Sequence, residues 1–306
     1  MNTFFTALVP ISVLIALGFG LKRIGFLPDA AWSGMEKLTY FVLFPVLLVS
    51  TLGGQSFVGT PWLEMLIVVV VTLTVAAAVL LLLRQMRSED DGAVFTSIFQ
   101  GGVRFNTYIT LAAAQGLYGA EGLAMASVTA GFMIVLINLM CIAVFSVWGR
   151  EQLTGIRPVI GEVIGNPLII ACVIGLTLSL SGIGLPGVTA EILEIIGRAA
   201  LPFGLLAVGA SLRLDVFRGH LSPIVFSSIV QFGIKPLTVA MMIAYTGLGG
   251  IAAGSLIIAF IVPTAPSAYI LARQLGGDAE AMASIITFQT LLAFLLMPVL
   301  ANLVAI

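Results

Sequence analysis

The feature that most constrains this chain is an internal repeat at a spacing of 157 residues. Each copy holds five apolar segments, and an odd number of membrane crossings per copy places the two copies in opposite orientations. Inverted repeats of this kind are typical of secondary transporters, with the substrate site near the membrane midplane between the copies. The matching positions include Pro10 and Pro167, Gly18 and Gly175, Pro45 and Pro202, and the tripeptides at 125–127 and 282–284.

The composition places the chain in a membrane. Of its 306 residues 60% are hydrophobic and only 9% are charged, with a mean hydropathy of +1.18, whereas soluble domains carry roughly 25% charged residues. The lipid bilayer is therefore the expected main environment. No basic cluster is available to neutralise phosphates, so the sequence argues against binding of nucleic acid.

A helix needs about 20 apolar residues to cross the hydrocarbon core. On this criterion we expect an all-α fold of ten transmembrane helices in two five-helix repeats, residues 1–150 and 151–306, which form one integrated unit. The expected spans are 4–21, 32–52, 62–83, 93–115, 121–148, 166–182, 190–212, 221–245, 250–273 and 281–304.

The loop charges predict the orientation. Basic residues gather in alternate connections, which the positive-inside rule assigns to the cytoplasm, and both termini are then non-cytoplasmic. No cleavable signal peptide is expected, because Lys22 and Arg23 follow the first apolar segment rather than precede it. The basic loop residues are Lys22, Arg23, Arg84, Arg87, Arg150, Arg157, Arg213, Arg218 and Arg273.

The fourth and ninth spans carry helix-disturbing residues at equivalent points. Asn106 and Pro263 are separated by the repeat spacing, and Pro266 follows three residues after Pro263. Proline removes a backbone donor and clashes with the preceding turn. Ordinary kinks are one interpretation. Because both copies are affected at the same point, we expect a pair of broken helices, which are tolerated at membrane depth where they are buried or line a wet cavity.

The residues at the two breaks, together with two proline-containing positions, resemble those of a known family. The stretch 263–284, PTAPSAYILARQLGGDAEAMAS, together with Asn106-Thr107, Phe44-Pro45 and Leu201-Pro202, resembles the auxin efflux carrier family, whose bacterial members include malate and malonate permeases. The likeness covers the whole chain and implies two inverted five-helix repeats with crossing broken helices, in a bacterial inner membrane. It also implies kinship with the bile-acid, auxin and arsenite transporter superfamily.

The chain departs from that family at one place. Family members usually carry a proline shortly after the asparagine of the fourth span, where this chain reads Leu111-Ala112-Ala113-Ala114. The resemblance therefore implies a milder break here, resting on Gly101, Gly102 and Asn106.

Broken helices that cross at the midplane bring half-helix N-termini together, and each carries about half a positive charge. Such a centre favours an anion, so we expect a substrate carboxylate there. The alternatives are a helix–helix hydrogen bond for Asn106 and capping of freed backbone groups for the two hydroxyls. The candidate residues in the two breaks are Asn106, Thr107, Pro263, Thr264, Pro266 and Ser267.

Four further residues complete the candidate site. Arg104 and Lys235 are charges predicted within the membrane, where such residues face a cavity or a partner; structural pairing or snorkelling is the alternative. Tyr108 and Tyr269 follow the two breaks and are candidates to line the cavity around an apolar part of the substrate, with packing as the alternative.

The expected function is secondary transport of small organic anions by alternating access. A channel, or a sodium-coupled symporter of a different solute, is the alternative. Few carboxylates fall inside the membrane, so uniport or weakly coupled transport is favoured, although sodium could use carbonyls together with Gln289 or Thr290. No protease motif or P-loop is present, so no enzyme activity, cofactor or metal is expected. The sequence leaves undecided whether the chain forms a homodimer.

Overall fold

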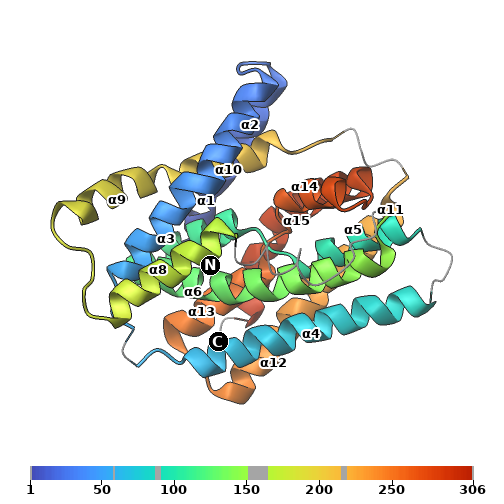
Figure 1. Ribbon diagram of the computed structural model, residues 1–306. Coiled ribbons are helices and arrows are strands. Elements are labelled where there is room, and N and C mark those ends of the chain that lie inside the picture. Colours follow the sequence, from blue (N-terminus) through green and yellow to red (C-terminus); the bar gives the residue numbers. More distant parts are fainter. Residues whose placement is uncertain (1, 58, 87–90, 151–164, 215–218, 305–306) are drawn as a thin grey trace.

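The computed structural model describes residues 2–57, 59–86, 91–150, 165–214 and 219–304. Throughout these ranges the secondary structure is helical and no strand is present. The predicted boundary between the two copies, after Arg150, lies outside the described residues, as do Arg87, Arg157 and Arg218. In Figure 1 α2 projects from one side of the helical body, and α4 runs along the opposite side.

The helices follow one another with short connections. They are α1 (Asn2–Arg23), α2 (Asp29–Leu38), η1 (Thr39–Leu43), α3 (Phe44–Gly53), α4 (Trp62–Met86), α5 (Gly92–Val103), α6 (Thr107–Trp148), α8 (Pro167–Leu180), α9 (Val188–Arg198), α10 (Ala200–Ala210), α11 (Leu221–Ile229), η2 (Val230–Ile234), α12 (Lys235–Thr246), α13 (Gly250–Ile261), α14 (Ser267–Gln274) and α15 (Ala279–Val304).

Within the described residues, seven helical stretches are long and apolar enough to cross a membrane, and α8 and α13 are shorter apolar helices. One of the seven, Gly92–Trp148, extends over 57 residues. It is interrupted after α5, and α6 itself turns at Gly119, whose φ of 64° and ψ of −148° are non-helical. Glycine tolerates this positive φ because it lacks a Cβ. An all-helical, multi-pass membrane protein is therefore confirmed.

Two helices widen for one turn just before a proline. The π-helical segment η1 precedes Pro45, and η2 precedes Pro236. A proline in a helix clashes with the carbonyl four residues earlier, and a π-turn accommodates that carbonyl without ending the helix. Each long helix therefore stays continuous across its proline, although its axis is disturbed there.

Two glycines related by the repeat spacing allow helices to approach closely. Gly18 of α1 faces the backbone of Leu206 in α10, where a Cβ would collide with the carbonyl. Gly175 of α8 faces α3 in the same way, where a Cβ would lie 2.8 Å from the Leu52 Cβ. Small residues at such contacts let membrane helices pack through their backbones. The pairs α1–α10 and α3–α8 are accordingly among the most extensive contacts in the fold.

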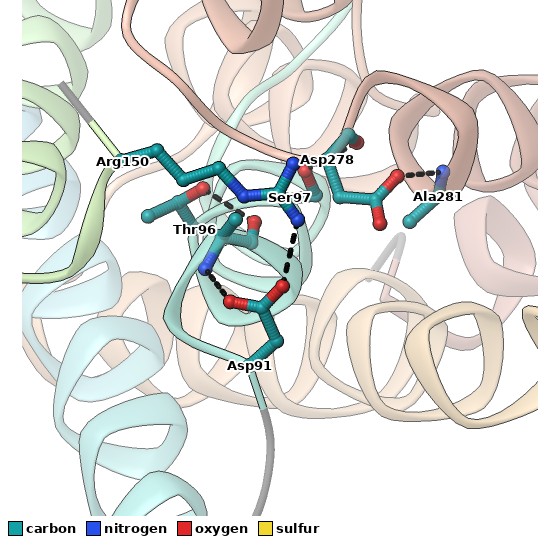
Figure 2. A network of polar contacts seen from close by, with 7 residues as sticks. Asp91, Thr96, Ser97, Arg150, Asp278 and Ala281 are labelled. Carbon is teal, nitrogen blue, oxygen red and sulfur yellow. Dashed lines mark hydrogen bonds and ion pairs between the residues drawn. The ribbon is translucent and has the colours of Figure 1, made fainter.

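One end of α5 is tied to the turn between α14 and α15. Arg150 donates to Asp91 at 2.8 Å, and its guanidinium lies between Asp91 and Asp278 (Figure 2). Ser97 donates to the Asp278 carbonyl at 2.8 Å, and the Asp278 carboxylate accepts the Ala281 N–H at 2.9 Å. This network fastens the outer ends of both interrupted helices to each other.

The Asp91–Arg150 pair gives a pH-dependent prediction. The hydrogen bond from Arg150 lowers the pKa of Asp91 below its ordinary value of 3.8. A carboxyl with a depressed pKa contributes stability above its unfolded pKa and loses it as the pH falls through the folded pKa. We expect Asp91→Asn, which keeps an N-cap acceptor for Ala93, to melt slightly below the wild type at pH 7. The gap between the two melting temperatures should narrow as the pH falls below the ordinary Asp pKa of 3.8; a gap that is unchanged by acidification would contradict the assignment.

Candidate functional site

The two interrupted helices cross and are hydrogen-bonded at their breaks. The chain leaves the helical conformation at Arg104, with φ −70° and ψ 163°, and re-enters it at Thr107. In the second interruption Val262 is likewise extended, with φ −75° and ψ 157°. The Asn106 N–H donates to the Pro263 carbonyl at 2.8 Å. The two residues that the repeat pairs are therefore in direct contact.

The first break is complete although it contains no proline. The milder break expected from Leu111–Ala114 is not seen, because α5 ends at Val103 and α6 starts anew with Asn106 as its N-cap. Its side-chain Oδ1 accepts the N–H groups of Tyr108 at 3.1 Å and Ile109 at 3.2 Å. Asparagine is a favoured N-cap because it satisfies donors that a helix start leaves unpaired. From the sequence, capping was considered only for the hydroxyls of Thr264 and Ser267 in the second break.

A cavity of about 430 Å³ lies beside the crossover. It is bounded by the two breaks, by α2 with η1, by the later part of α6 and by the starts of α8 and α14. Six of the ten residues that the sequence proposes line it: Arg104, Asn106, Thr107, Tyr108, Pro266 and Ser267.

Three helices begin at this cavity. Asn106 and Thr107 open α6, Asn166 caps the start of α8, and Ser267 is the first residue of α14. Each helix start carries a partial positive charge, worth about 0.3–1 kcal/mol to a nearby anion and more where the site is partly buried. Because the three starts share one cavity, their fields add at its interior and favour a negatively charged ligand.

Arg104 supplies the full positive charge at the crossover. Its Nη2 donates to the Asn138 side-chain oxygen at 3.1 Å. Its Nε is buried and has no hydrogen-bond partner among the described residues, and the same holds for the Asn106 Nδ2. A buried donor without a partner costs about 1–3 kcal/mol. Both donors belong to residues that line the cavity, but the two atoms themselves lie beneath its surface.

Aromatic side chains border the polar end of the cavity. Tyr108 stacks on Phe44 with ring centroids 4.5 Å apart. The Asn166 amide donates to the Tyr40 hydroxyl at 3.3 Å, and both residues line the cavity. Apolar surface thus adjoins the donor groups. This arrangement suits a ligand with a polar head and a less polar body.

Four proposed residues do not line the cavity. Thr264 is buried, and its N–H donates to Gln289 Oε1 at 3.1 Å. Tyr269 packs in a small apolar cluster with Ile285 and Met282. Pro263 contributes its carbonyl to Asn106, and Lys235 bonds the carbonyl of Arg104.

The sequence reasoning did not name several polar residues that line the cavity. Asn138 lies in an otherwise apolar helix, and Asn166 stands directly before the helix-opening Pro167; both patterns are readable signals, since polar residues at membrane depth usually face a cavity. Glu36 and Lys37 lie near the start of the expected span 32–52 and carry no site signal in the sequence. The unforeseen polar lining residues are Ser33, Glu36, Lys37, Tyr40, Asn138, Asn166 and Gln274.

Comparisons with known proteins place the chain among membrane transport proteins. A family model described as "Membrane transport protein" matches residues 3–301. An "Uncharacterized transporter" of Methanothermobacter thermautotrophicus is 21% identical over 287 residues, which cover 94% of this chain and 93% of the relative. The family match confirms the resemblance that the residues of the two breaks suggest.

Proposed function

Because this chain belongs to the membrane transport protein family, whose model spans nearly all of it, we propose that it is a secondary transporter of small organic anions. The substrates are carboxylates, bound in the cavity at the crossover and moved by alternating access. The observation that carries the proposal is the convergence of three helix starts and Arg104 on a single cavity.

Alternating access rests on an inverted-repeat architecture, which we propose for this chain. The seven long apolar stretches become eight when Gly92–Trp148 is divided at Gly119. Counting α8 as one more span, and α13 with α14 as another, gives ten. The packing supports it: the first span packs on the seventh, as α1 on α10, and the sixth packs on the second, as α8 on α3. Such reciprocal pairing is the pattern that two copies related by a two-fold axis produce.

The proposed orientation places the basic helix ends in the cytoplasm and both termini on the other side of a bacterial inner membrane. Lys22 and Arg23 at the end of α1 share a groove with Arg213, which follows α10. These residues come from different copies, and their proximity supports a common basic face. That face is cytoplasmic by the positive-inside rule.

The test of the proposed function is ligand-dependent thermal stability. A ligand that binds only the folded state raises its stability by mass action. We expect the purified protein to melt at a higher temperature with one or more members of a panel of mono- and dicarboxylates, and proteoliposomes to show saturable uptake and counterflow of the same acid. Linear, non-saturating flux would indicate a channel, and no shift with any acid would contradict carboxylate binding.

Arg104→Gln should weaken carboxylate binding by about tenfold to a hundredfold, because a hydrogen bond to a charged group contributes about 1.5–3 kcal/mol. Arg104→Lys should retain part of the affinity, since the charge stays but the planar fork is lost. The measurement is the concentration of acid that gives half of the maximal thermal shift in each variant. Unchanged affinity in the glutamine variant would remove Arg104 from the binding site.

A further inference from the structure

A groove of about 440 Å³ lies where α1 and α10 end. Three of its lining residues belong to the end of α1, and the other three follow α10 after one intervening residue. Half of them are basic, so the fold assembles a small cationic cluster that the sequence does not contain as a continuous run. The lining residues are Phe19, Lys22, Arg23, Leu212, Arg213 and Leu214.

The groove begins where the close contact between α1 and α10 stops. Gly209, near the end of α10, packs on the α1 backbone, and a Cβ there would lie 2.8 Å from the Phe19 nitrogen. The segment after α10 is also fixed to a third helix, because the Arg213 N–H donates to the Thr287 hydroxyl of α15 at 3.0 Å. The groove is therefore built on backbone contacts among three helices.

The three basic side chains of the groove differ in their surroundings. Lys22 is half-buried and forms an ion pair with Asp29 at 2.5 Å. Arg23 is exposed, and its guanidinium lies 5.7 Å from the centroid of the Phe19 ring, within the range of a cation–π interaction. Arg213 is exposed as well. Since Asp29 offsets one of the three cations, the described residues of the groove carry a net positive charge.

The groove lies at the level where a membrane-spanning helix ends. α1 is apolar over Thr6–Arg23, and both of its charges fall in the last turn. Lysine and arginine at the end of a span extend toward the lipid headgroups, while apolar neighbours stay in contact with the hydrocarbon. Such neighbours are present, because Leu17 and Ile24 are both exposed. The groove therefore opens at the depth of the headgroups, on whichever side of the membrane it faces.

The lining of the groove combines two chemistries. An arginine side chain binds phosphate oxygens through a planar fork of donors, and Phe19, Leu212 and Leu214 supply apolar walls. A small soluble anion would use only the cations, whereas a phospholipid joins a phosphate to acyl chains and uses both. The net positive charge favours an anionic headgroup over one that carries its own cation. Basic pockets between transmembrane helices bind anionic headgroups by this chemistry.

We propose that this groove binds the headgroup of an anionic diacyl phospholipid. Arg23 and Arg213 hold the phosphate, and the apolar walls contact the first carbons of the acyl chains. The bound lipid bridges the end of α1 and the segment after α10, and so connects the first half of the chain with the second. The site does not depend on which solute the protein carries.

The wild type tests the site without any substitution. We expect dioleoyl phosphatidylglycerol, added to the protein in neutral detergent micelles, to raise the melting temperature in a saturable way. Dioleoyl phosphatidylcholine should have a much smaller effect. Glycerol phosphate, which has the anionic headgroup without acyl chains, should have none at equal concentration. Equal stabilisation by phosphatidylcholine would overturn the proposal, and an equal shift with glycerol phosphate would replace it with a site for soluble anions.

Substitution of the two arginines locates the site. Each charge lost near the membrane surface should weaken binding about fivefold, so the Arg23→Gln, Arg213→Gln double variant should lose about 25-fold. The measurement is the phosphatidylglycerol concentration that gives half of the maximal thermal shift. The corresponding double lysine variant keeps both charges and should retain most of the affinity. Unchanged affinity in the double glutamine variant would overturn the proposal.

Arg84→Gln is the matched control. Arg84 lies in the last turn of α4 and does not line the groove, so its loss removes an arginine from another helix end. The affinity for phosphatidylglycerol should stay at the wild-type value. A loss as large as that of the double glutamine variant would mean that the lipid responds to the overall charge of the protein and not to this groove.

Photocrosslinking supplies a readout that needs no folded variant. Phosphatidylglycerol with a photoreactive acyl chain should label wild-type peptides from the end of α1 and from the segment after α10. Unlabelled phosphatidylglycerol should compete, and phosphatidylcholine should not. Labelling of other segments only would contradict the site. Since no transported acid is present in these assays, their outcome is separate from that of the carboxylate panel.

Discussion

Asn106→Asp is expected to fold as the wild type does and to lose at least about 100-fold in carboxylate transport. The aspartate keeps the acceptor that caps Tyr108 and Ile109, so α6 still begins at Thr107. It loses the Nδ2 donor, which has no partner within the described structure, and adds a negative charge beside the cavity. A lost hydrogen bond to a charged ligand costs about 1.5–3 kcal/mol, and repulsion between like charges adds to this.

Uptake into proteoliposomes, normalised to folded protein by size exclusion and melting temperature, checks this expectation. Asn106→Ala serves as the comparison, because it removes both the donor and the cap; it should lose transport and also about 1 kcal/mol of stability. Wild-type uptake by the aspartate variant would show that Asn106 only caps α6 and that the carboxylate binds elsewhere.

The second large effect concerns stability. Gly18→Ala places a methyl group against the Leu206 backbone of α10, where it cannot fit without separating the helices. Overpacking of this kind costs about 1–3 kcal/mol, and more where backbone must move. Gly20→Ala is a matched control in the same helix, because a Cβ there meets no heavy atom within 4 Å.

The apparent melting temperature and the monodisperse fraction in detergent measure both variants. Gly18→Ala should fall well below the wild type, whereas Gly20→Ala should equal or exceed it because alanine is the better helix former. Equal behaviour of the two variants would mean that α1 and α10 are not held by this close contact.

Much of the fold is readable from the sequence because the bilayer allows few structures. Backbone groups in hydrocarbon must be satisfied within a helix, so apolar length alone predicts the segments that the structure shows as helices. The positions of both interruptions follow from Asn106, Pro263 and Pro266. That the break between α5 and α6 is complete could not be predicted from the sequence. A proline is the usual sequence signal for a broken helix, whereas this break depends on the N-cap Asn106.

The candidate site was predictable only where its residues lie in the breaks themselves. The six predicted residues that line the cavity belong to segments 104–108 and 266–267. The other polar lining residues, such as Tyr40, Asn138 and Asn166, come from segments that approach the breaks only in three dimensions. Lys235 could be recognised as a buried charge, but two of its three acceptors are backbone carbonyls more than 130 residues away. The sequence gives no signal for a backbone carbonyl that acts as an acceptor.

The hydrogen bond between Asn106 N–H and the Pro263 carbonyl has a consequence for biogenesis. During synthesis the first half of the chain enters the membrane while its acceptor has not yet been made. Until the second half is inserted, the Asn106 N–H lacks this partner at a depth where an unsatisfied group costs several kcal/mol. The two halves have similar sequences, but the first half must wait in the membrane for a partner that the second half supplies. A ribosome that stalls before residue 263 leaves a product that quality control should remove rather than a usable half-transporter.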